Sequence, residues 1–568
     1  MYILGISCYY HDASASLIRD GRVVAAAAQE RFSQKKHDAS FPHDAIAFCL
    51  AQENISFDDV DHVAFYEKPL LKLERVISQF MDAFPRSFSS FLHSMPSWIN
   101  EKTRIIRKIR KLGYQKDIFF IEHHLSHASS FLMSPFDEAA ILSVDGVGEW
   151  STTVCAHGKN NSIEMIKELP FPHSLGLFYS AMTAFLGFSV NNSEYKVMGL
   201  GAYGEQDKNK NRFYRRLKKV IDMKKDGSFH LDTSYFSFYR TRRMFTKRLI
   251  SLLRISPREK DALLTKKHED LAAATQMIYE DALFALLDEL ARVSSSRNLV
   301  LTGGCALNSV ANGKIISHTP FKEVWIQPDP GDGGASLGAA SYAYHALLKK
   351  KRADSLADPF LGPSFSSDEV KRFLEDNQIR YQKFDLQELP SIAAKLIFEN
   401  NIVGWFQGRM EWGPRALGAR SILANPLNKK MSSLLNKRIK KRESFRPFAP
   451  MCLKDEVDDY FDLKKDSLLA PFMLTVCQVK QKWRETLPSV VHVDGSARVQ
   501  TVTKDNSLCY SLLKEFKKLS GVPIIINTSF NVRGDPIVCS LDDAIKSMKK
   551  TDLDYLFLEN YLIRGEDL

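Results

Sequence analysis

The sequence predicts a mixed α/β protein whose N-terminal half contains a duplicated unit. Residues 3–28 (ILGISCYYHDASASLIRDGRVVAAAA) read as an apolar strand, a polar turn, a second strand, an Asp-Gly turn and a third strand. Residues 141–166 (ILSVDGVGEWSTTVCAHGKNNSIEMI) repeat this order, with Asp-Gly in the first turn. Apolar runs joined through Asp-Gly or Gly-Lys-Asn are hairpin signals. The two segments therefore predict two similar three-stranded units.

Duplicated strand–turn–strand units of this kind resemble the two-lobed ATPase fold of actin and sugar kinases. In that fold the two turns face each other across a nucleotide cleft, which is an analogy of fold. A helical stretch at residues 268–292 follows the second unit, and residues 301–340 then read as a strand, a Gly-Gly turn and further helices. A helix that starts at such a turn presents free N–H groups to a ligand.

A change of composition marks the expected domain boundary. Residues 345–364 (HALLKKKRADSLADPFLGPS) pass from charged residues to proline and glycine, which predicts one domain at 1–350 and a second at 351–568. The second domain also reads as mixed α/β, and VPIIINTSFNVRGDPIV in it is a buried strand that runs into a polar turn.

Composition narrows the class of protein. The chain has 568 residues, 44% hydrophobic and 26% charged, which is typical of globular domains. No apolar run approaches the roughly 20 residues of a membrane span, and MYILGISCYYHDAS reads as a first strand rather than a signal peptide. The 8 cysteines are scattered without a CxxC pair, which favours reduced thiols in the cytoplasm and argues against a zinc knuckle.

The net charge of +11 is concentrated in clusters at residues 102–111, 209–225 and 239–267. Apolar residues interrupt each cluster at helical spacing, so amphipathic surface helices with a cationic outer face are the favoured interpretation. An acidic substrate, a nucleic acid or an anionic membrane surface stays open as the reason for the charge.

A candidate metal site lies in the segment IEHHLSHASSFL. His123 and His127 are four residues apart, which places both imidazoles on one face of a helix. Asp145 in the VDG turn and Asp332 in PGDGG could add carboxylates, a set that suits Fe(II), Mn or Zn. His124 should point off that face and is expected to be structural.

His11 and Asp12 stand in the first turn, YYHDASAS. Near a cleft they would suit general-base work on a substrate hydroxyl. The alternative is that Asp12 and Ser14 only cap the turn. The sequence leaves these two interpretations open.

The segment from Gly404 to Pro450 carries arginines among glycines, prolines and aromatic residues: Arg409, Arg415, Arg420, Arg442 and Arg446. Guanidinium groups on tight turns suit bidentate recognition of phosphate or carboxylate, so the segment predicts an anion site. No Walker GxxxxGK[ST] motif is present, which excludes a P-loop.

Two further segments are expected to converge on this block. Arg498 lies in VDGSARVQTV, after a turn and before an alternating strand. Asn527, Thr528 and Ser529 lie at a strand end, where α/β sheets bind ligands. With Lys440 they could hold a triphosphate and a small carbonyl compound.

Taken in order, the motifs resemble those of the NodU/CmcH family of O-carbamoyltransferases, of the TobZ type. The motifs are YYHDASASL, ERFSQKKHDASFP, HHLSHA, EYKVMGLGAYG, GGCALN, GDGGASLGA, MEWGPRALGARSI, FRPFAP, VDGSARVQTV and INTSFNVRGDPIV. The match extends over nearly the whole chain and is therefore more specific than any one motif.

The resemblance implies a metal-bearing N-terminal domain similar to the ATPase of threonylcarbamoyl-tRNA formation and a C-terminal domain similar to YrdC. It implies that carbamoyl-adenylate forms from carbamoyl phosphate and Mg²⁺-ATP in the C-terminal domain and that the carbamoyl group passes to a hydroxyl at an N-terminal site with Fe²⁺ or another divalent metal. Carried over by position, the adenylate-forming residues are Arg415, Lys440, Arg446, Arg498, Asn527 and Ser529, and the metal-binding residues are His123, His127, Asp145 and Asp332.

The expected partners are therefore ATP, carbamoyl phosphate and a small natural product or sugar with a hydroxyl group, without a membrane span or a nucleic acid, and with a homodimer left open. Two alternatives remain at this stage. One is a tRNA-modifying enzyme of the threonylcarbamoyl type, since both domains resemble parts of that pathway. The other is a non-enzymatic nucleotide- or sugar-binding regulator. A hydrogenase-maturation carbamoyltransferase would carry zinc-binding CxxC pairs, which are absent here.

Overall fold

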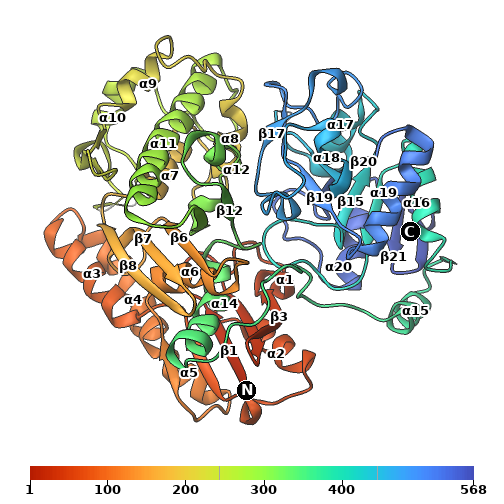
Figure 1. Cartoon of the computed structure of the whole chain (residues 1–568), viewed down its shortest axis with the longest axis horizontal. Helices are drawn as coiled ribbons and strands as arrows, with labels where there is room; N and C mark the ends of the chain where they lie inside the picture. Colours follow the sequence, from red (N-terminus) through yellow and green to blue (C-terminus); the bar gives the residue numbers. More distant parts are fainter. Residues whose placement is uncertain (239, 242, 444) are drawn as a thin grey trace. The chain divides into compact units, whose positions relative to one another are not determined.

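The computed structural model describes residues 1–238, 240–241, 243–443 and 445–568. The chain divides into two compact units (Figure 1). The N-terminal unit comprises Met1–Ala25 and Ala39–Leu356, and the C-terminal unit comprises Ala26–Asp38 and Ala357–Leu568. Residues 26–38 thus group with the C-terminal unit, although they follow directly on the first strands.

The N-terminal unit is built on two five-stranded sheets with the same topology. The first has the order β3-β2-β1-β4-β5 and the second has the order β8-β7-β6-β11-β12. In the first, β1 is antiparallel to β2 and parallel to β4; in the second, β6 is antiparallel to β7 and parallel to β11. The strands are β1 (Tyr2–Ser7), β2 (Ser14–Arg19), β3 (Arg22–Ala28), β4 (His62–Phe65), β5 (Ile118–Phe120), β6 (Glu138–Val144), β7 (Ser151–Lys159), β8 (Ser162–Pro170), β11 (Asn298–Thr302) and β12 (Glu323–Trp325).

This topology confirms the predicted duplication and the actin- and sugar-kinase-like class of the N-terminal unit. The central strands β1 and β6 are buried along almost their whole length, as strands covered on both faces must be. The edge strand β8 instead alternates between exposed and partly buried residues.

Helices of the N-terminal unit surround these sheets. The predicted helix at residues 268–292 is confirmed as α11 (Lys266–Val293), and PGDGGASLGAA is confirmed as the start of a buried helix, α14 (Asp332–Tyr342). The other helices are α2 (His43–Gln52), α3 (Pro69–Asp82), α4 (Phe88–Asn100), α5 (Ile105–Lys111), α6 (His123–Ala128), α7 (Leu175–Phe185), α8 (Glu194–Gly201), α9 (Arg212–Leu217), α10 (Lys247–Leu253), α12 (Ser309–Asn312) and α13 (Ile315–His318).

Helix α14 packs against β1, β2 and the short helix α6. Glycines make this close approach: a Cβ atom at Gly338 would lie 1.9 Å from the backbone oxygen of Ser126 in α6. The approach to β1 also depends on a glycine, because a Cβ at Gly5 would lie 2.0 Å from the Ser336 carbonyl oxygen. The small residues of α14 therefore bring the start of this helix next to α6.

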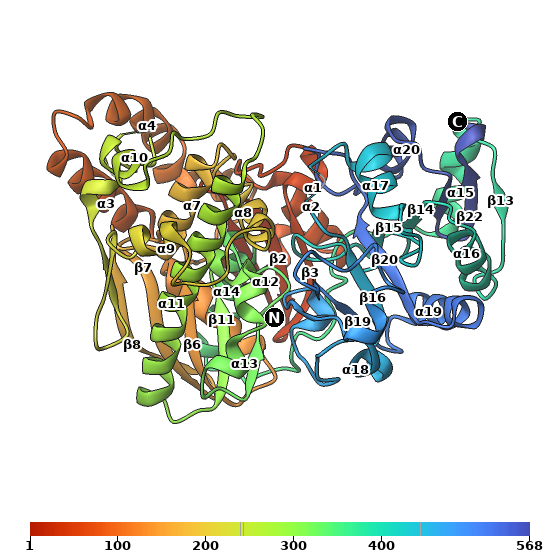
Figure 2. The ribbon, with the colours of Figure 1, turned by 90° about the horizontal axis from the view of Figure 1, so that it is seen from above.

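The C-terminal unit contains an eight-stranded mixed sheet in the order β13-β22-β21-β14-β15-β20-β16-β19. Helices α16 and α19 pack on each other and on its central strands (Figure 2). The strands are β13 (Gln382–Lys383), β14 (Val403–Phe406), β15 (Arg420–Ala424), β16 (Ala449–Leu453), β19 (Gln500–Val502), β20 (Ile524–Ser529), β21 (Tyr555–Leu558) and β22 (Tyr561–Arg564), and β17 (Cys477–Gln478) pairs separately with β18 (Ser496–Ala497). The helices are α1 (Glu30–Ser33), α15 (Ser367–Asp376), α16 (Leu389–Phe398), α17 (Met431–Leu434), α18 (Val457–Tyr460), α19 (Ser507–Ser520) and α20 (Leu541–Lys550).

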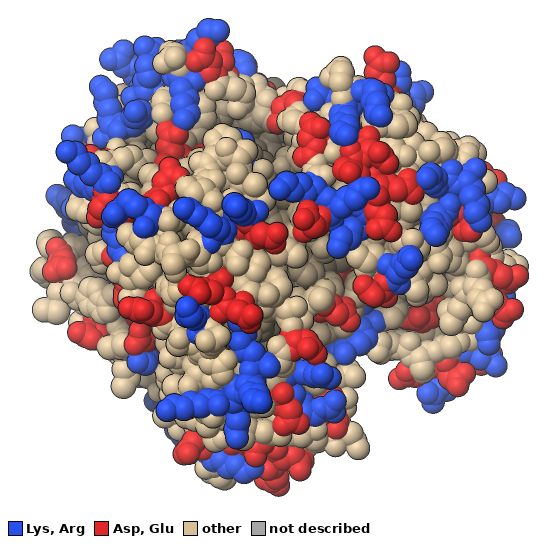
Figure 3. Space-filling view, viewed as in Figure 1, with Lys and Arg blue, Asp and Glu red and all other residues tan. Residues whose placement is uncertain are grey.

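The basic clusters are only partly helical. Residues 105–111 form α5, which buries Ile105 and Ile109 as an amphipathic helix should. The second cluster forms α9 and then the strand β9 (Ile221–Met223), which pairs with β10 (Phe229–Leu231), so the prediction of one continuous helix was wrong there. The third contributes α10, while its positions 239 and 242 lie outside the described residues. Lys and Arg side chains gather over α9 and α10 (Figure 3).

Among the helices in the described part of the chain, none combines the length and the apolar character that crossing a membrane demands.

Replacing Gly338 with alanine should destabilise the N-terminal unit. The added methyl group meets the Ser126 backbone oxygen at 1.9 Å, so α14 must move away from α6. Overpacking of this kind costs about 1–3 kcal/mol of unfolding free energy, measured by chemical denaturation. The control is Gly199→Ala in α8, where nothing lies within 4 Å of the added atom. Unfolding of both variants at the same denaturant concentration would show that Gly338 is not required for the close packing of α14 on α6.

Candidate functional sites

The helix α6 places His123 and His127 side by side in the interior of the N-terminal unit. Both side chains are fully buried, and their Nε2 atoms lie 3.2 Å apart. Glu149 fixes the start of this helix, because both of its carboxylate oxygens accept the His123 backbone N–H at 3.0 Å. The same carboxylate accepts the backbone N–H of Lys68 at 2.8 Å. No local sequence pattern marks Glu149 for this role.

Two carboxylates from separate elements complete this group. Asp145 follows β6, and its Oδ2 lies 3.0 Å from Nε2 of His123 and 3.5 Å from Nε2 of His127. Asp332 opens α14, and its Oδ1 lies 3.7 Å and 3.5 Å from the same two nitrogens. The backbone N–H of Gly304 donates to Oδ1 of Asp145 at 3.3 Å and so orients that carboxylate.

The four side chains fit a divalent metal ion. Their facing atoms lie within 4.8 Å of one another, and all four residues are buried. A metal held at about 2.1 Å by each ligand needs neighbouring ligand atoms about 3.0–3.4 Å apart. The observed separations of 3.0–3.7 Å are close to that range. Two imidazoles with two carboxylates suit Fe(II), Mn(II) or Zn(II).

The pKa values of these residues describe how the cluster holds protons in place of a metal ion. Burial disfavours a charged imidazole, but Asp145 and Asp332 outweigh it and raise the pKa of His127 to about 9. Burial would likewise raise the pKa of Asp145, yet hydrogen bonds with His123 and His127 hold it well below its ordinary value. Oδ2 of Asp332 is buried and makes no hydrogen bond to the described residues. A metal ion would satisfy this set of groups better than a proton.

His124 stands apart from the cluster, as expected from its place on the helix. Its Nε2–H donates to the Ser151 carbonyl oxygen at 2.9 Å, and its Nδ1 accepts from the Ser143 hydroxyl at 2.8 Å. Burial and the neighbouring imidazoles lower its pKa to about 3. His124 is therefore a neutral, structural residue.

His11 and Asp12 form a tight pair in the turn after β1. Nδ1 of His11 lies 2.5 Å from Oδ2 of Asp12, and Nε2 contacts the carbonyl oxygen of Asn191. Because both ring nitrogens face acceptors, both carry a proton. Burial opposes this charge, but Asp12 outweighs it and the pKa of His11 rises to about 10. A protonated His11 is a cation that orients the Asp12 carboxylate.

In the C-terminal unit, part of the arginine block gathers around Arg498. The pKa of this guanidinium is held well below its ordinary value by burial and by repulsion from Arg415, Arg442 and Arg446. Arginine does not give up its proton in proteins, so the cluster stores repulsion that a bound anion would relieve. The carboxylate of Glu443 offsets part of this repulsion, because its Oε2 lies 3.7 Å from Nη1 of Arg446. This gathering of cations makes the group a candidate site for a multiply charged anion. We refer to Arg415, Arg442, Arg446 and Arg498 as the arginine cluster.

Lys440 lies at the edge of this cluster and is buried. Its Nζ donates to the Ser529 carbonyl oxygen at 2.5 Å and to Oδ1 of Asn531 at 2.8 Å. Burial and the charges of Arg442 and Arg446 lower its pKa well below the ordinary value. The contacts join Lys440 to the end of β20.

Asn527 is buried in β20, two positions before the end of the strand. Its Nδ2 donates to the Ala416 carbonyl oxygen at 3.1 Å and to Oε1 of Gln500 at 2.7 Å. These bonds hold the loop of Arg415 against the sheet. Oδ1 of Asn527 is buried and makes no hydrogen bond to the described residues.

Two arginines of the block do not belong to the anion site. Arg420 is fully buried and donates to the carbonyl oxygens of Gln407 and Pro363, and Arg409 donates to the carbonyl oxygen of Gly362. Arg409 and Arg420, which the sequence analysis named only as part of the block, therefore brace the backbone. Oε1 of Glu411 accepts the backbone N–H groups of Leu417, Ala419 and Arg420, which makes it an organiser of the loop that the sequence analysis missed.

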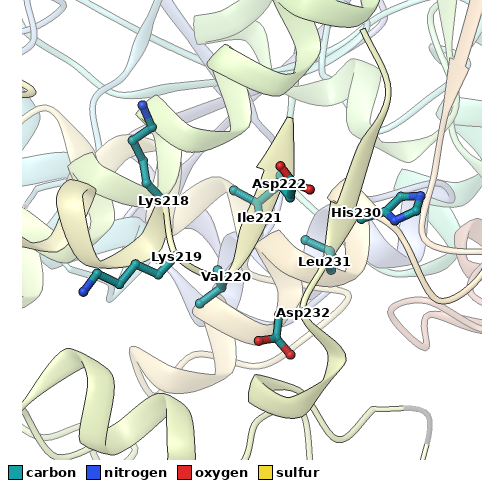
Figure 4. Close-up of a pocket in the computed structure, with 8 residues that line it drawn as sticks. All are labelled: Lys218, Lys219, Val220, Ile221, Asp222, His230, Leu231 and Asp232. Carbon is teal, nitrogen blue, oxygen red and sulfur yellow. The ribbon is translucent and has the colours of Figure 1, made fainter. Parts of the chain in front are cut away.

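A pocket on the basic insert lies apart from these residues (Figure 4). Lys219, Asp222, His230 and Asp232 line it, and all four are exposed. It contains no buried polar residue and is not a candidate active site.

Metal binding should depend on the cluster and not on His124. Asp332→Asn and His127→Ala each remove a ligand and should lose bound metal, whereas His124→Gln should keep it. The measurement is the metal content of the purified chain after equilibration with Fe²⁺, Mn²⁺ or Zn²⁺. Equal metal content in all three variants would contradict the assignment.

The stabilising effect of His11 should depend on pH. Its pKa is about 10 in the folded chain and 6.5 in its ordinary state, so its contribution is fully present below pH 6.5 and is lost as the pH rises through 10. The difference in unfolding free energy between the wild type and His11→Gln should therefore shrink between pH 7 and pH 10.5, as measured by urea denaturation. A difference that grows with pH would show that His11 is neutral in the fold.

Relatives of the chain include an uncharacterized protein of Synechocystis, 42% identical over 99% of this chain and 96% of that protein. The nodulation protein NolNO of Sinorhizobium fredii is 34% identical over 98% of this chain and 79% of its own length. Among solved structures, component A of the (R)-2-hydroxyglutaryl-CoA dehydratase of Acidaminococcus fermentans has a TM-score of 0.34, with 15% identity over 60% of this chain and 97% of that chain. A score this low says nothing about activity.

Two family models match the chain directly. The carbamoyltransferase N-terminus matches residues 2–341, and the carbamoyltransferase C-terminus matches residues 394–565. The metal-type cluster lies within the first match and the arginine cluster within the second. The chain belongs to the carbamoyltransferase family and is a carbamoyltransferase enzyme.

Proposed function

We propose that this carbamoyltransferase is ATP-dependent, forms carbamoyl-adenylate in the C-terminal unit and transfers the carbamoyl group to a hydroxyl in the N-terminal unit. The observation that carries the proposal is the arginine cluster, because a carbamoyl donor alone does not require so many cations. Carbamoyl phosphate together with Mg²⁺-ATP supplies enough negative charge to match it.

The first step activates the carbamoyl group. Carbamoyl phosphate loses its phosphoryl group to water as inorganic phosphate and becomes carbamate. A carbamate oxygen attacks the α-phosphorus of ATP, the bond to the β-phosphate bridging oxygen breaks, and pyrophosphate leaves. Negative charge accumulates on oxygens at this point, and fixed guanidinium groups stabilise it without rearranging. The other three guanidinium groups all act on Arg498, so we assign to it the largest share of this stabilisation.

Lys440, Asn527 and Ser529 position this site. Lys440 joins its own segment to the end of β20 through the carbonyl oxygen of Ser529. Oδ1 of Asn527, which is buried and makes no hydrogen bond to the described residues, is available to a donor on the carbamoyl amide or the adenine.

In the second step the acceptor hydroxyl oxygen attacks the carbamoyl carbon. The bond between that carbon and the phosphate oxygen breaks, and AMP leaves with the electron pair. We assign Asp12 as the acceptor of the hydroxyl proton and His11 as the cation that orients its carboxylate. A divalent ion such as Fe²⁺, held by His123, His127, Asp145 and Asp332, supplies charge neutralisation at the adenylate phosphate when it is bound.

The acceptor is assigned as a small hydroxylated natural product or sugar. Carbamoyl transfer requires one nucleophilic hydroxyl on the acceptor and does not require the acceptor to be charged. A panel of sugar, aminoglycoside and macrolide acceptors tested with labelled carbamoyl phosphate would identify it.

The two steps should separate by mutation. Arg498→Ala should reduce ATP–pyrophosphate exchange dependent on carbamoyl phosphate by at least about 100-fold, because it removes the central guanidinium. His127→Ala should leave this exchange intact and stop carbamoyl transfer. Exchange of labelled pyrophosphate into ATP measures the first step, and labelled product measures the second.

Arg484→Ala is the matched control, since that arginine donates to the Val479 carbonyl oxygen and lies outside the arginine cluster. Equal loss of exchange in Arg498→Ala and His127→Ala would contradict the division into two sites. No exchange in the wild-type chain under any condition would instead favour a regulator without ATP turnover. Carbamoylation that requires tRNA would favour the tRNA-modifying alternative.

A further inference from the structure

Helix α3 has an inverted pattern of burial. Its buried residues are two cations, Lys72 and Arg75, which are 2% and 5% exposed. Several of its apolar residues face outward instead, with Leu70 73% and Met81 71% exposed, while Leu73, Val76 and Phe80 are partly buried. An ordinary surface helix buries its apolar stripe and exposes its cations. Burying two cations costs free energy. This cost implies that a positive charge is needed in the interior of the N-terminal unit.

The two buried cations differ in how they are paired. Lys72 forms an ion pair with Glu67, which is buried as well. Arg75 donates from Nη1 to Oε1 of Gln79 at 3.0 Å, and its Nε is buried without a hydrogen bond to the described residues. No carboxylate among the described residues lies within the 4.0 Å of an ion pair from Arg75. Lys72 has a carboxylate in contact, whereas the negative charges of Glu67 and Glu149 act on Arg75 only from beyond ion-pair distance.

Arg75 lies on the side of α3 that faces the metal cluster. Lys72, one turn before it, has its Nζ 4.3 Å from the ring centroid of Tyr10 and 6.0 Å from that of Tyr66. The ring of Tyr66 lies 5.5 Å from that of His123. The charges of Asp145, Asp332 and Arg75 all act on Tyr10. The charge of Glu149, whose carboxylate accepts the His123 backbone N–H, acts on Arg75 as well.

A buried guanidinium without an anion is costly, and a phosphate oxygen is the partner that satisfies it best. The guanidinium is also packed against Phe171, with its central carbon 5.1 Å from the ring centroid, which fixes its position. Such a group can bind an anion without first having to be ordered.

We propose that Arg75 binds the phosphate group of the adenylate that is consumed at the metal cluster, which makes it an anion-binding residue of the transfer step. This inference rests on the proposed function. As the acceptor oxygen attacks and the carbon–oxygen bond to phosphate breaks, the phosphate gains one negative charge and becomes AMP. A fixed guanidinium favours that change and holds the leaving group away from the carbamoyl carbon.

The test compares AMP with adenosine, since the two differ only in the phosphate. Both are titrated by calorimetry into the full-length, metal-loaded chain that carries Arg498→Ala, which weakens nucleotide binding at the C-terminal site. Adding Arg75→Gln should weaken AMP binding by about 10-fold to 100-fold, the value of a hydrogen bond to a charged group, and leave adenosine binding unchanged. Arg75→Lys should retain part of the preference for AMP.

Arg86→Gln is the matched control, because Arg86 is exposed and follows the same helix. The proposal is overturned if Arg75→Gln leaves the ratio of AMP to adenosine affinity unchanged, or if it weakens both ligands equally with a fall in melting temperature, which marks a structural role. It is also overturned if the variant raises the acceptor KM while AMP inhibition stays unchanged, since the anion would then belong to the acceptor. Pyrophosphate exchange in the Arg75→Gln chain with Arg498 intact tests the proposed function separately.

Discussion

The close approach of α14 to α6 is the constraint on which the N-terminal site depends. Asp332 opens α14 and the two histidines lie on α6, so the distance between carboxylate and imidazole is set by how closely these helices pack. Gly338 allows that distance, because any side chain there would meet the Ser126 backbone oxygen. The sheet contributes Asp145, which a second glycine, Gly304, holds through its backbone N–H. Packing of backbone against backbone thus defines the metal cluster.

The candidate sites of the two units call for ligands of opposite charge. The N-terminal cluster brings two carboxylates together and needs a cation, whereas the C-terminal cluster brings guanidinium groups together and needs an anion. Arg498 among three other guanidinium groups is unfavourable without a counter-charge, and one buried carboxylate oxygen of Asp332 makes no hydrogen bond to the described residues. These features make both clusters candidate binding sites, in contrast to the ordinary ion pairs on the surface of the chain.

Much of this could be predicted from the sequence, because it depended on local patterns. The four-residue spacing of His123 and His127 and the order of strands in the repeat follow from the periods of helix and strand. The structure then brought Asp145 and Asp332 to the histidines, as the motifs indicated. Local spacing could not show Glu149, since it acts on a helix that begins 26 positions earlier in the chain. Its role depends on tertiary contact alone.

Arg420 and Arg498 show why the rest could not be read from the sequence. Both stand among small residues in family motifs, and both are buried guanidinium groups. Around Arg420 are backbone carbonyl oxygens, which accept from both of its Nη atoms, and the ring of Phe406, whereas around Arg498 are other cations. Residue type and turn chemistry are the same in the two cases, so only the surroundings decide between a brace and a binding group. The same reasoning applies to Lys72 and Arg75 on α3. Glu67 makes the first a structural ion pair, whereas the second has no carboxylate of the described residues in contact and is therefore a candidate for binding substrate.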